Sequence, residues 1–317
     1  MARKTGSRKN GQPVHGWVNL DKPVGVSSAK AVAIIRRVFN AAKAGHGGTL
    51  DPLASGVLPI ALGEATKTVA FAMGSRKSYE FTLAWGAETS TDDGEGTITN
   101  ISEKRPSEAE VKAVLPQFIG HINQVPPAYS AIKIGGQRAY KLARKADADN
   151  AENAVKLAPR PIFIETCALL THNDNESRFY VACGKGAYIR SMARDIGHAV
   201  GSAAYVTSLR RVSVGSFHAD AAISLDFLEN LEHSAPAFEH LHPVVSALDD
   251  IPALPITGDE ASLLRHGQTL GALSQSAQMR FAGLAGGETG IALHGDIPVA
   301  LVAIKAGAVC PVRVLNL

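Results

Sequence analysis

The sequence predicts a protein that combines helices and strands and ends in a small module of short strands. Residues 79–85 alternate Tyr79, Phe81, Leu83 and Trp85 with smaller or polar residues, which is the period of a strand with one aromatic face. Residues 188–200 instead repeat their apolar side chains every three to four positions, which predicts a helix. From residue 254 onward, one short helix and several short strands predict a β-barrel-like module.

Local signals predict the earlier elements in order. Residues 17–20 are expected to form a strand that leads into a turn at 21–25, and Ser27 or Ser28 is expected to cap the next helix. Residues 44–63 are predicted as a loop that ends in a buried segment near 57–62, because glycine and proline are frequent at its start. Residues 106–110 have the pattern of a capping box, so a helix is expected to begin there.

The second half of the chain is predicted to continue with strands at 162–170, 178–183 and 204–212. In the helix at 188–200, Arg190 and Arg194 lie one turn apart, on a different face from the apolar side chains. Residues 143–158 have few large apolar side chains, so we expect an exposed, mobile excursion there. The tail is predicted to contain a helix from Asp259 to His266 and strands at 298–304 and 311–315.

The composition is typical of a soluble globular protein. Of the 317 residues, 45% are hydrophobic and 19% are charged, and no apolar run approaches the roughly 20 residues of a membrane span. The basic N-terminus has no apolar segment behind it, so it is not a secretory signal. The three cysteines lie far apart without a C-x-x-C pair, which indicates reduced thiols in the cytoplasm rather than disulfides or a zinc site.

Basic residues are concentrated in the first two thirds of the chain. Residues 1–212 hold 28 Lys and Arg against 18 Asp and Glu, whereas residues 213–250 hold seven acidic residues and no Lys or Arg. A local basic surplus is what a protein needs to bind a polyanion such as a nucleic acid. Solvated lysines and arginines that meet no ligand would give the same count, so charge alone leaves both interpretations open.

The loop at 45–56, GHGGTLDPLASG, is the most unusual stretch of the sequence. It places His46 and Asp51 five positions apart in a glycine-rich turn ahead of an apolar segment. No lysine follows as in a phosphate-binding loop, and neither a G-x-S-x-G elbow nor an H-E-x-x-H helix occurs in the chain. From these residues alone, Asp51 is more simply interpreted as a turn-capping side chain.

Five stretches of the sequence resemble the bacterial tRNA pseudouridine synthase B family, in the family's order. The first stretch starts with this loop and continues beyond it, GHGGTLDPLASGVLPIALGEATK, and it is similar to the family's catalytic motif. The other stretches are LDKPVGVSS near the start, QVPPAYSAIKIGGQRAYKLAR at 124–144, GAYIRSMARDIG at 186–197 and VTSLRRVSVG at 206–215. Together they span most of residues 17–215, which makes chance agreement a poor explanation.

The resemblance implies a catalytic role for three residues. Asp51 matches the family's catalytic aspartate, which acts directly on the target nucleotide. Arg190 matches the arginine that pairs with that aspartate, and Tyr79 matches the tyrosine that stacks on the flipped uracil. Without the family, Arg190 would be interpreted as a surface residue of a helix and Tyr79 as part of the core.

Other residues are implied to bind the substrate. His46 matches a histidine that contacts the RNA near the flipped base, and Tyr188 and Leu209 match residues that line the base pocket. Lys22 and the basic run at 133–144 match segments of the family that lie near the RNA. That run includes Lys133 and Arg138.

The resemblance also implies the fold and the reaction. Residues 1–250 would form an α+β catalytic domain on a mixed sheet with flanking helices, and residues 251–317 a PUA-like RNA-binding module. The protein would isomerise one uridine, at position 55 in the T arm of tRNA, to pseudouridine after flipping the base out of the RNA. Atoms move only within one nucleotide, so no cofactor or metal is expected. We expect a cytoplasmic monomer; neither a membrane nor a protein partner is implied.

Two alternatives remain open. The chain could be an RNA-binding protein or tRNA-folding chaperone that opens the T arm without catalysis, or a pseudouridine synthase that acts on another RNA site. The presence of Asp51, Arg190 and Tyr79 argues against the first alternative, because binding alone requires no carboxylate facing an RNA that repels it.

Overall fold

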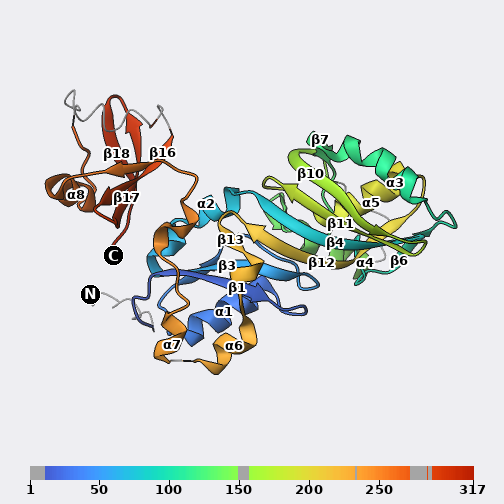
Figure 1. Cartoon of the computed structure of the whole chain (residues 1–317), viewed down its shortest axis with the longest axis horizontal. Coiled ribbons are helices and arrows are strands. Elements are labelled where there is room, and N and C mark those ends of the chain that lie inside the picture. Colours follow the sequence, from blue (N-terminus) through green and yellow to red (C-terminus); the bar gives the residue numbers. More distant parts are fainter. Residues whose placement is uncertain (1–10, 149–156, 233, 272–283, 285–287) are drawn as a thin grey trace. The chain divides into compact units, whose positions relative to one another are not determined.

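The computed structural model of the chain describes residues 11–148, 157–232, 234–271, 284 and 288–317 (Figure 1). These residues form two compact units. The first unit contains the described residues up to Leu50, Val57–Met73 and the chain from Gly215 onward. The second contains Asp51–Gly56 and Gly74–Val214. Within the described part of the chain, no helix is long and apolar enough to cross a membrane.

The first unit is built on three strands in the order β14-β1-β3, with β2 paired antiparallel to β3. Their bounds are β1 Gly16–Lys22, β2 Ala44–His46, β3 Ser55–Leu62 and β14 Ile223–Ser224. Helix α1, Ser28–Val38, follows β1, and Ser27 caps it by accepting a hydrogen bond from the Lys30 backbone. The strand at 17–20, the cap at Ser27 and the buried segment at 57–62 are therefore confirmed.

The other short elements of the first unit connect these strands and cover them. They are η1 Gly63–Lys67, α2 Val69–Gly74, β13 Phe217–His218, η3 Ala219–Ala221, α6 Leu225–Asn230, α7 Ala235–Phe238 and η4 Val244–Ala247. Helix α6 packs against α1.

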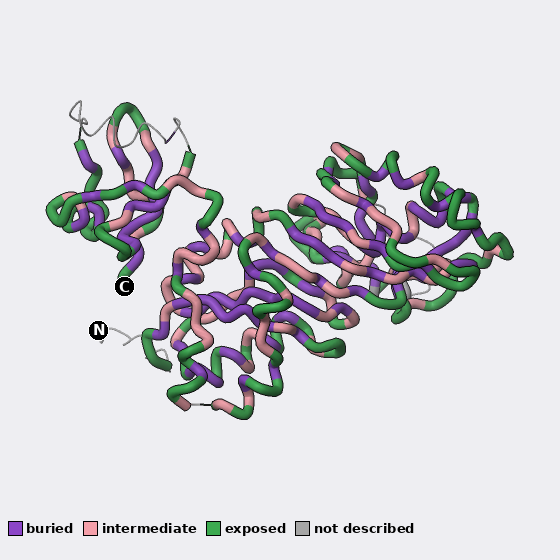
Figure 2. The backbone as a smooth tube through the Cα atoms, viewed as in Figure 1, coloured by how far each residue is buried: buried purple, intermediate pink, exposed green. Residues whose placement is uncertain are grey.

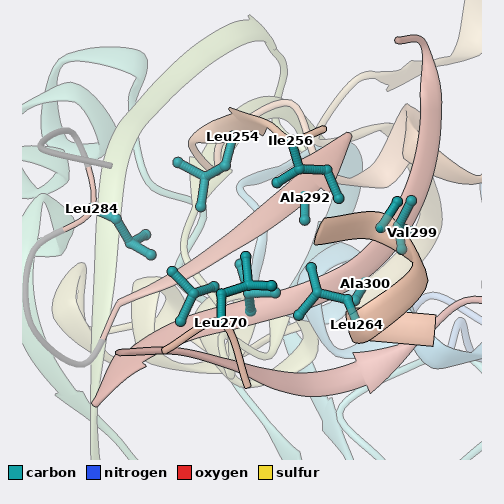
Figure 3. Close-up of a cluster of buried hydrophobic side chains, with 11 residues drawn as sticks. Leu254, Ile256, Leu264, Leu270, Leu284, Ala292, Val299 and Ala300 are labelled. Atoms are coloured by element: carbon teal, nitrogen blue, oxygen red, sulfur yellow. The ribbon is translucent and has the colours of Figure 1, made fainter. Parts of the chain in front are cut away.

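The end of the chain forms a four-stranded sheet with its own core (Figure 3). Leu254, Leu264 and Leu270 are among the buried side chains of this core. The sheet order is β15-β16-β17-β18, and the described residues form an open sheet, not the barrel that the sequence led us to expect. The predicted helix and both predicted strands are confirmed. The bounds are β15 Ala253–Pro255, α8 Gly258–Arg265, β16 Thr289–His294, β17 Ile297–Lys305 and β18 Ala308–Val314.

The second unit contains a sheet in the order β12-β4-β11-β10-β7. Neighbouring strands in this order all pair antiparallel. Strand β12 also pairs in parallel with the start of β3, so the sheet is mixed as predicted. The sequence predicted β4, β10, β11 and β12 at the right positions. The bounds are β4 Lys77–Trp85, β7 Gly120–Gln124, β10 Arg160–His172, β11 Glu176–Cys183 and β12 Ala204–Val214.

From Tyr79 onward, the residues of β4 alternate between buried and partly exposed, as the sequence predicts; Figure 2 shows the burial along the chain. Tyr79, Phe81, Leu83 and Trp85 are all buried, and Phe81 stacks on Phe179 of β11 with ring centroids 5.1 Å apart. Helix α5, Ile189–Ala199, packs against β12 and β4 and buries its apolar side chains there. The mixed sheet with its covering helices makes the protein an α+β fold.

Shorter elements complete the second unit. Helix α3, Glu108–Val114, begins with the predicted capping box of Ser107 and Glu110. Two hairpins were not predicted, one of β5 Ala87–Thr89 with β6 Ile98–Ile101 and one of β8 Lys133–Ile134 with β9 Gln137–Arg138. The remaining elements are η2 Leu115–Phe118 and α4 Ala139–Ala148.

Helix α4 corrects one prediction. Residues 143–148 belong to helix α4, whereas the sequence led us to expect an exposed, mobile excursion over 143–158; residues 149–156 lie outside the described residues. Ala139 and Ala143 are both buried and lie four positions apart, on one helix face. The lack of large apolar side chains was a poor criterion, because alanine has the highest helix propensity of all residues.

Strand β3 begins in close contact with the backbone of β12. Ser55 and Gly56 pair in parallel with Arg210 and Arg211. Gly56 has φ +101°, and a Cβ atom there would lie 2.1 Å from the Arg211 carbonyl oxygen. Only glycine fits this position, since both its φ angle and the available space exclude a side chain. The contact fixes the end of the 45–56 loop against the sheet of the second unit.

We expect Gly56→Ala to destabilise the protein more than Gly120→Ala. Both glycines have positive φ, +101° and +92°, where a side chain costs about 1–3 kcal/mol. A Cβ atom at Gly120 would meet nothing within 4 Å, so Gly120→Ala measures the conformational cost alone. Thermal unfolding of the two variants should show the larger loss for Gly56→Ala. Equal losses would contradict the close approach of Gly56 to β12.

Candidate active site

Asp51 lies in a turn whose start is fixed by helix α1. The Ser28 hydroxyl, in the first turn of α1, donates to the Leu50 carbonyl and accepts from the Leu50 backbone N–H, both at 2.8 Å. After Asp51, the Ala54 backbone N–H donates to the Asp51 carbonyl at 3.1 Å. The side chain of Asp51 is 37% exposed, so this turn presents a carboxylate to solvent from a fixed backbone.

Arg190 of α5 binds Asp51 through a single carboxylate oxygen. Arg190 Nε donates a hydrogen bond to Asp51 Oδ2 at 3.0 Å, and Arg190 Nη2 lies 2.9 Å from the same oxygen as part of the ion pair. Across the described residues, no donor meets the other oxygen, Oδ1. The arrangement therefore orients the carboxylate with one oxygen and leaves the second available to a bound molecule.

The guanidinium of Arg190 is itself buried, with a side chain only 6% exposed. Its Nη1 donates to the Thr91 carbonyl at 2.8 Å and its Nη2 to the Tyr129 carbonyl at 3.0 Å. A second carboxylate, Asp93, lies 3.4 Å from Nη1. These partners fix the guanidinium plane, so the direction from which it grips Asp51 is also fixed.

Asp93 is a residue that sequence reasoning missed. Its side chain is 3% exposed, and its Oδ1 accepts hydrogen bonds from the Thr91 hydroxyl at 2.5 Å and from the Glu95 backbone at 3.0 Å. A buried carboxylate requires a counter-charge, and Arg190 supplies it. The available signal was the acidic pair in TSTDDG at 89–94, a region for which the sequence predicted no element.

Tyr79 and Leu209 lie on one face of the sheet. Tyr79 is buried opposite Arg211 of β12, and Leu209 is buried opposite Phe81. Burial raises the pKa of Tyr79, although a hydrogen bond with the Arg211 guanidinium opposes this effect. The Asp51 carboxylate is close enough to raise the Tyr79 pKa further, so the hydroxyl stays protonated near neutral pH.

Tyr188 is the residue that leads into α5. Its backbone N–H donates to Gln124 Oε1 at 2.8 Å, and its carbonyl accepts from Gln124 Nε2 at 3.1 Å. This two-point contact with β7 holds the start of α5, two residues before Arg190. Burial raises the pKa of Tyr188, and Asp51 contributes to this shift too. The structure thus brings Arg190, Tyr79 and Tyr188 within electrostatic reach of Asp51.

The other residues implied to bind substrate occupy different environments. His46 ends β2, and its Nδ1 accepts from the Gly48 backbone at 3.3 Å. Lys22 is fully buried, and its ammonium donates to the Pro23 and Val26 carbonyls at 2.7 and 2.8 Å. It therefore shapes the turn after β1 from inside, and its contact with a nucleic acid stays a prediction. Lys133 and Arg138 are exposed on the β8–β9 hairpin.

The described residues contain no group of three or more His, Cys, Asp or Glu side chains that could hold a metal ion. The three cysteines are free thiols, of which Cys167 and Cys183 are buried. Burial raises the pKa of Cys183 to about 11, so this thiol is unreactive near neutral pH.

Comparison with known families and proteins gives consistent matches. Residues 36–189 match the model of the TruB family pseudouridylate synthase (N terminal domain), and residues 190–251 match the tRNA pseudouridylate synthase B C-terminal domain. A tRNA pseudouridine synthase B of Rhodospirillum rubrum is 48% identical over 98% of this chain and 99% of the relative. One of Caulobacter vibrioides is 46% identical over 98% and 99%.

Solved structures share the fold. A Cbf5-Nop10-Gar1 complex contains a chain that aligns with a TM-score of 0.69 and 25% identity, covering 95% of this chain and 85% of that one. An H/ACA RNP bound to a substrate RNA containing 2′-deoxyuridine aligns with a TM-score of 0.70 and 23% identity, covering 99% and 92%. At this identity, the second likeness supports the fold alone.

We expect Arg190→Met to lower the free energy of unfolding by about 3–5 kcal/mol, because it leaves Asp93 buried without its counter-charge. Arg178→Met is the matched control, since Arg178 pairs with Glu80 at a largely exposed position in the same sheet. Arg178→Met should lower the free energy of unfolding by about 0–1 kcal/mol. Urea unfolding measures both values, and similar losses would contradict the role of Arg190 as a buried structural cation.

Proposed function

Because the chain belongs to the TruB family of pseudouridylate synthases, we propose that it converts one uridine of tRNA to pseudouridine, at position 55 in the T arm. The names of the full-length relatives, tRNA pseudouridine synthase B, support tRNA as the substrate. The T-arm position rests on the resemblance of the 45–56 loop and the other four stretches. A cytoplasmic monomer without a protein partner is part of the same proposal, and its free cysteines fit a reducing compartment.

The observation that carries the proposal is the asymmetric grip of Arg190 on Asp51. Two guanidinium nitrogens hold Oδ2, while Oδ1 has no donor among the described residues and the side chain is partly exposed. A carboxylate that served only to cap its turn would use its oxygens on nearby backbone N–H groups. In our proposal, Asp51 is the acting carboxylate, and Arg190 orients it.

The reaction suits a site built from a single carboxylate. It breaks the bond between N1 of the uracil and C1′ of the ribose, and it joins C5 of the uracil to C1′. The C5 proton leaves and N1 gains a proton, so no external group or electron is required. Asp51 Oδ1 can attack the sugar, attack the base or move a ribose proton. All three routes need the same ionised and oriented carboxylate.

Tyr79, Tyr188 and Leu209 would receive the uracil after it leaves the RNA stack. Extruding a base costs a few kcal/mol, and stacking on an aromatic ring offsets about 1–3 kcal/mol of that. Tyr79 fits this role because its ring is fixed by the β4–β12 pairing and its hydroxyl is held by Arg211. The buried Leu209 on the same sheet face would supply an apolar wall.

The tRNA backbone would bind basic groups around this site. The exposed Lys133 and Arg138 on the β8–β9 hairpin fit phosphate contacts, as does the surplus of ten basic residues in 1–212. Arg138 also donates to the Ala131 carbonyl at 2.5 Å, which ties the hairpin to the segment that precedes it. His46 would contact the RNA next to the flipped base.

The direct test incubates the protein with an unmodified tRNA transcript and maps pseudouridine by carbodiimide chemistry. The expected result is one modified uridine, at position 55, and no product on a transcript with cytidine there. A product at another position would overturn the assignment of the T arm. The absence of any product, on this or other RNAs, would overturn the function.

We expect Asp51→Asn to keep tRNA affinity and to lose pseudouridine formation by at least about a hundredfold, because the amide preserves the shape but not the charge. Asp174→Asn is the control, since Asp174 is exposed in the turn between β10 and β11. Single-turnover rates at saturating enzyme and filter-binding affinities separate the two effects. Turnover of Asp51→Asn within tenfold of the parent would remove Asp51 from its role.

We expect Tyr79→Phe to retain substantial activity and Tyr79→Ala to lose much of it. The first substitution keeps the aromatic face, whereas the second removes stacking worth about 1–3 kcal/mol. Single-turnover kinetics on the same tRNA measures both variants. If Tyr79→Phe were as damaging as Tyr79→Ala, the hydroxyl held by Arg211 would be the working group and the stacking account would be wrong.

A further inference from the structure

Two arginines of α5, one helical turn apart, both hold the short segment at 91–93. Arg190 Nη1 donates to the Thr91 carbonyl and pairs with Asp93. Arg194 Nη1 donates to Asp92 Oδ2 at 2.8 Å. The segment therefore meets α5 at three consecutive residues, and the middle one is held by an arginine that takes no part in the contact with Asp51.

The same two arginines also hold a second segment, at 125–129. Arg194 Nη2 donates to the Val125 carbonyl at 3.0 Å, and Arg190 Nη2 donates to the Tyr129 carbonyl at 3.0 Å. Arg194 thus contacts Asp92, in the middle of the 91–93 segment, and Val125, at the start of the 125–129 segment, and both segments supply partners to Arg190. Asp195, the next residue of α5, accepts from Arg194 Nη2 at 2.9 Å and helps to fix its guanidinium.

The backbone at Asp92 needs such an anchor. Asp92 has φ +59°, in the left-handed region that non-glycine residues rarely occupy. Its side chain is 11% exposed. Its carbonyl accepts from the Val206 backbone at 3.1 Å, and the Gly94 backbone donates to Val206 at 3.0 Å. A strained residue persists only where its surroundings hold it, and here they are the backbone of β12 and the side chain of Arg194.

We propose that Arg194 and Asp92 are positioning residues, whose ion pair holds the 91–93 segment so that Thr91 and Asp93 keep Arg190, and through it Asp51, in place. Neither residue needs to touch the substrate. The catalytic consequence rests on the proposed function, whereas the mechanical consequence, an anchored 91–93 segment, does not. The two parts are therefore tested separately.

The mechanical part is tested by amide hydrogen exchange of the free protein. Arg194→Met removes the charge and the contacts with Asp92, Val125 and Asp195 but keeps an apolar stem. The Gly94 and Val206 amides should exchange about tenfold faster in this variant. The matched control is Glu88→Gln: Glu88 pairs with His198 of the same helix at 2.7 Å and otherwise bonds, within the described residues, to Asn100. Unchanged exchange in Arg194→Met, or an equal change in Glu88→Gln, would overturn the anchor.

The catalytic part is tested by comparing rate with affinity. Misplacing a catalytic group by about 1 Å can cost on the order of a hundredfold in rate. Arg194→Met should therefore lower the single-turnover rate at saturating tRNA by about ten- to a hundredfold, with affinity within about twofold of the parent. Arg194→Lys keeps the charge but not the planar fork, so its single-turnover rate should lie between those of the parent and Arg194→Met. An equal loss of rate and affinity, or no loss of rate, would contradict the positioning role.

A pH profile provides a readout that general destabilisation would not change. Burial raises the pKa of Asp92 to about 6; the charged groups facing it are Arg194, Arg190 and Asp195 on α5 and Asp93 in its own segment. Above this pH the carboxylate is ionised and holds Arg194, and below it the protonated acid resembles the amide of Asn. The ratio of the parent rate to the Asp92→Asn rate should therefore be largest near pH 8 and approach one near pH 5. A constant ratio would contradict the proposal.

These outcomes separate the two proposals. A parent protein that forms no pseudouridine would overturn the proposed function, while the exchange experiment would still decide whether the anchor exists. A parent protein that is active, with faster exchange but an unchanged rate in Arg194→Met, would overturn the positioning role and leave the function in place.

Discussion

The buried guanidinium of Arg190 imposes the constraint on which the rest of the site depends. A charge in this environment must meet opposite charge and hydrogen-bond acceptors, and here they are Asp51, Asp93 and two backbone carbonyls. Those acceptors come from three segments, near residues 51, 91–93 and 129, and none of the three belongs to a named helix or strand. The apolar stripe of α5 packs on the sheet and thereby fixes the direction in which Arg190 points. Satisfying one cation thus assembles three loops around one carboxylate.

The sheet of the second unit provides the rigid support for this arrangement. Strand β4 lies between β12 and β11, so Tyr79 is held from both sides, and Arg211 holds its hydroxyl. Gly56 allows the loop that carries Asp51 to run directly against the backbone of Arg211. The carboxylate and the aromatic ring are therefore positioned by the same strand, β12, as the proposed function requires of a site that holds a flat base next to an acid.

The elements and residues that could be predicted share a local or family signal. The strong alternation of β4 and the helical period of α5 were predicted correctly, as was the capping box of α3. Asp93 could not be predicted, because its partner Arg190 lies about a hundred residues away and no local pattern links them. The burial of Lys22 was also unpredictable, since a lysine is ordinarily exposed and its carbonyl partners are set by the turn. The pairing of Asp51 with Arg190 was expected only through the family resemblance; the residues alone favoured a turn cap and a surface arginine.

In the proposed site, Arg190 acts by orienting Asp51 and contributes little to tRNA affinity. Arg190→Lys tests it most directly, because lysine keeps the positive charge but loses the planar fork that grips Oδ2 with two nitrogens. Single-turnover rates at saturating enzyme and filter-binding affinities would be measured on the same tRNA, with protein shown to be folded by circular dichroism. We predict a fall in rate of about tenfold or more with affinity within about twofold of the parent. A variant that keeps the parent rate, or that loses affinity as much as rate, would contradict the claim.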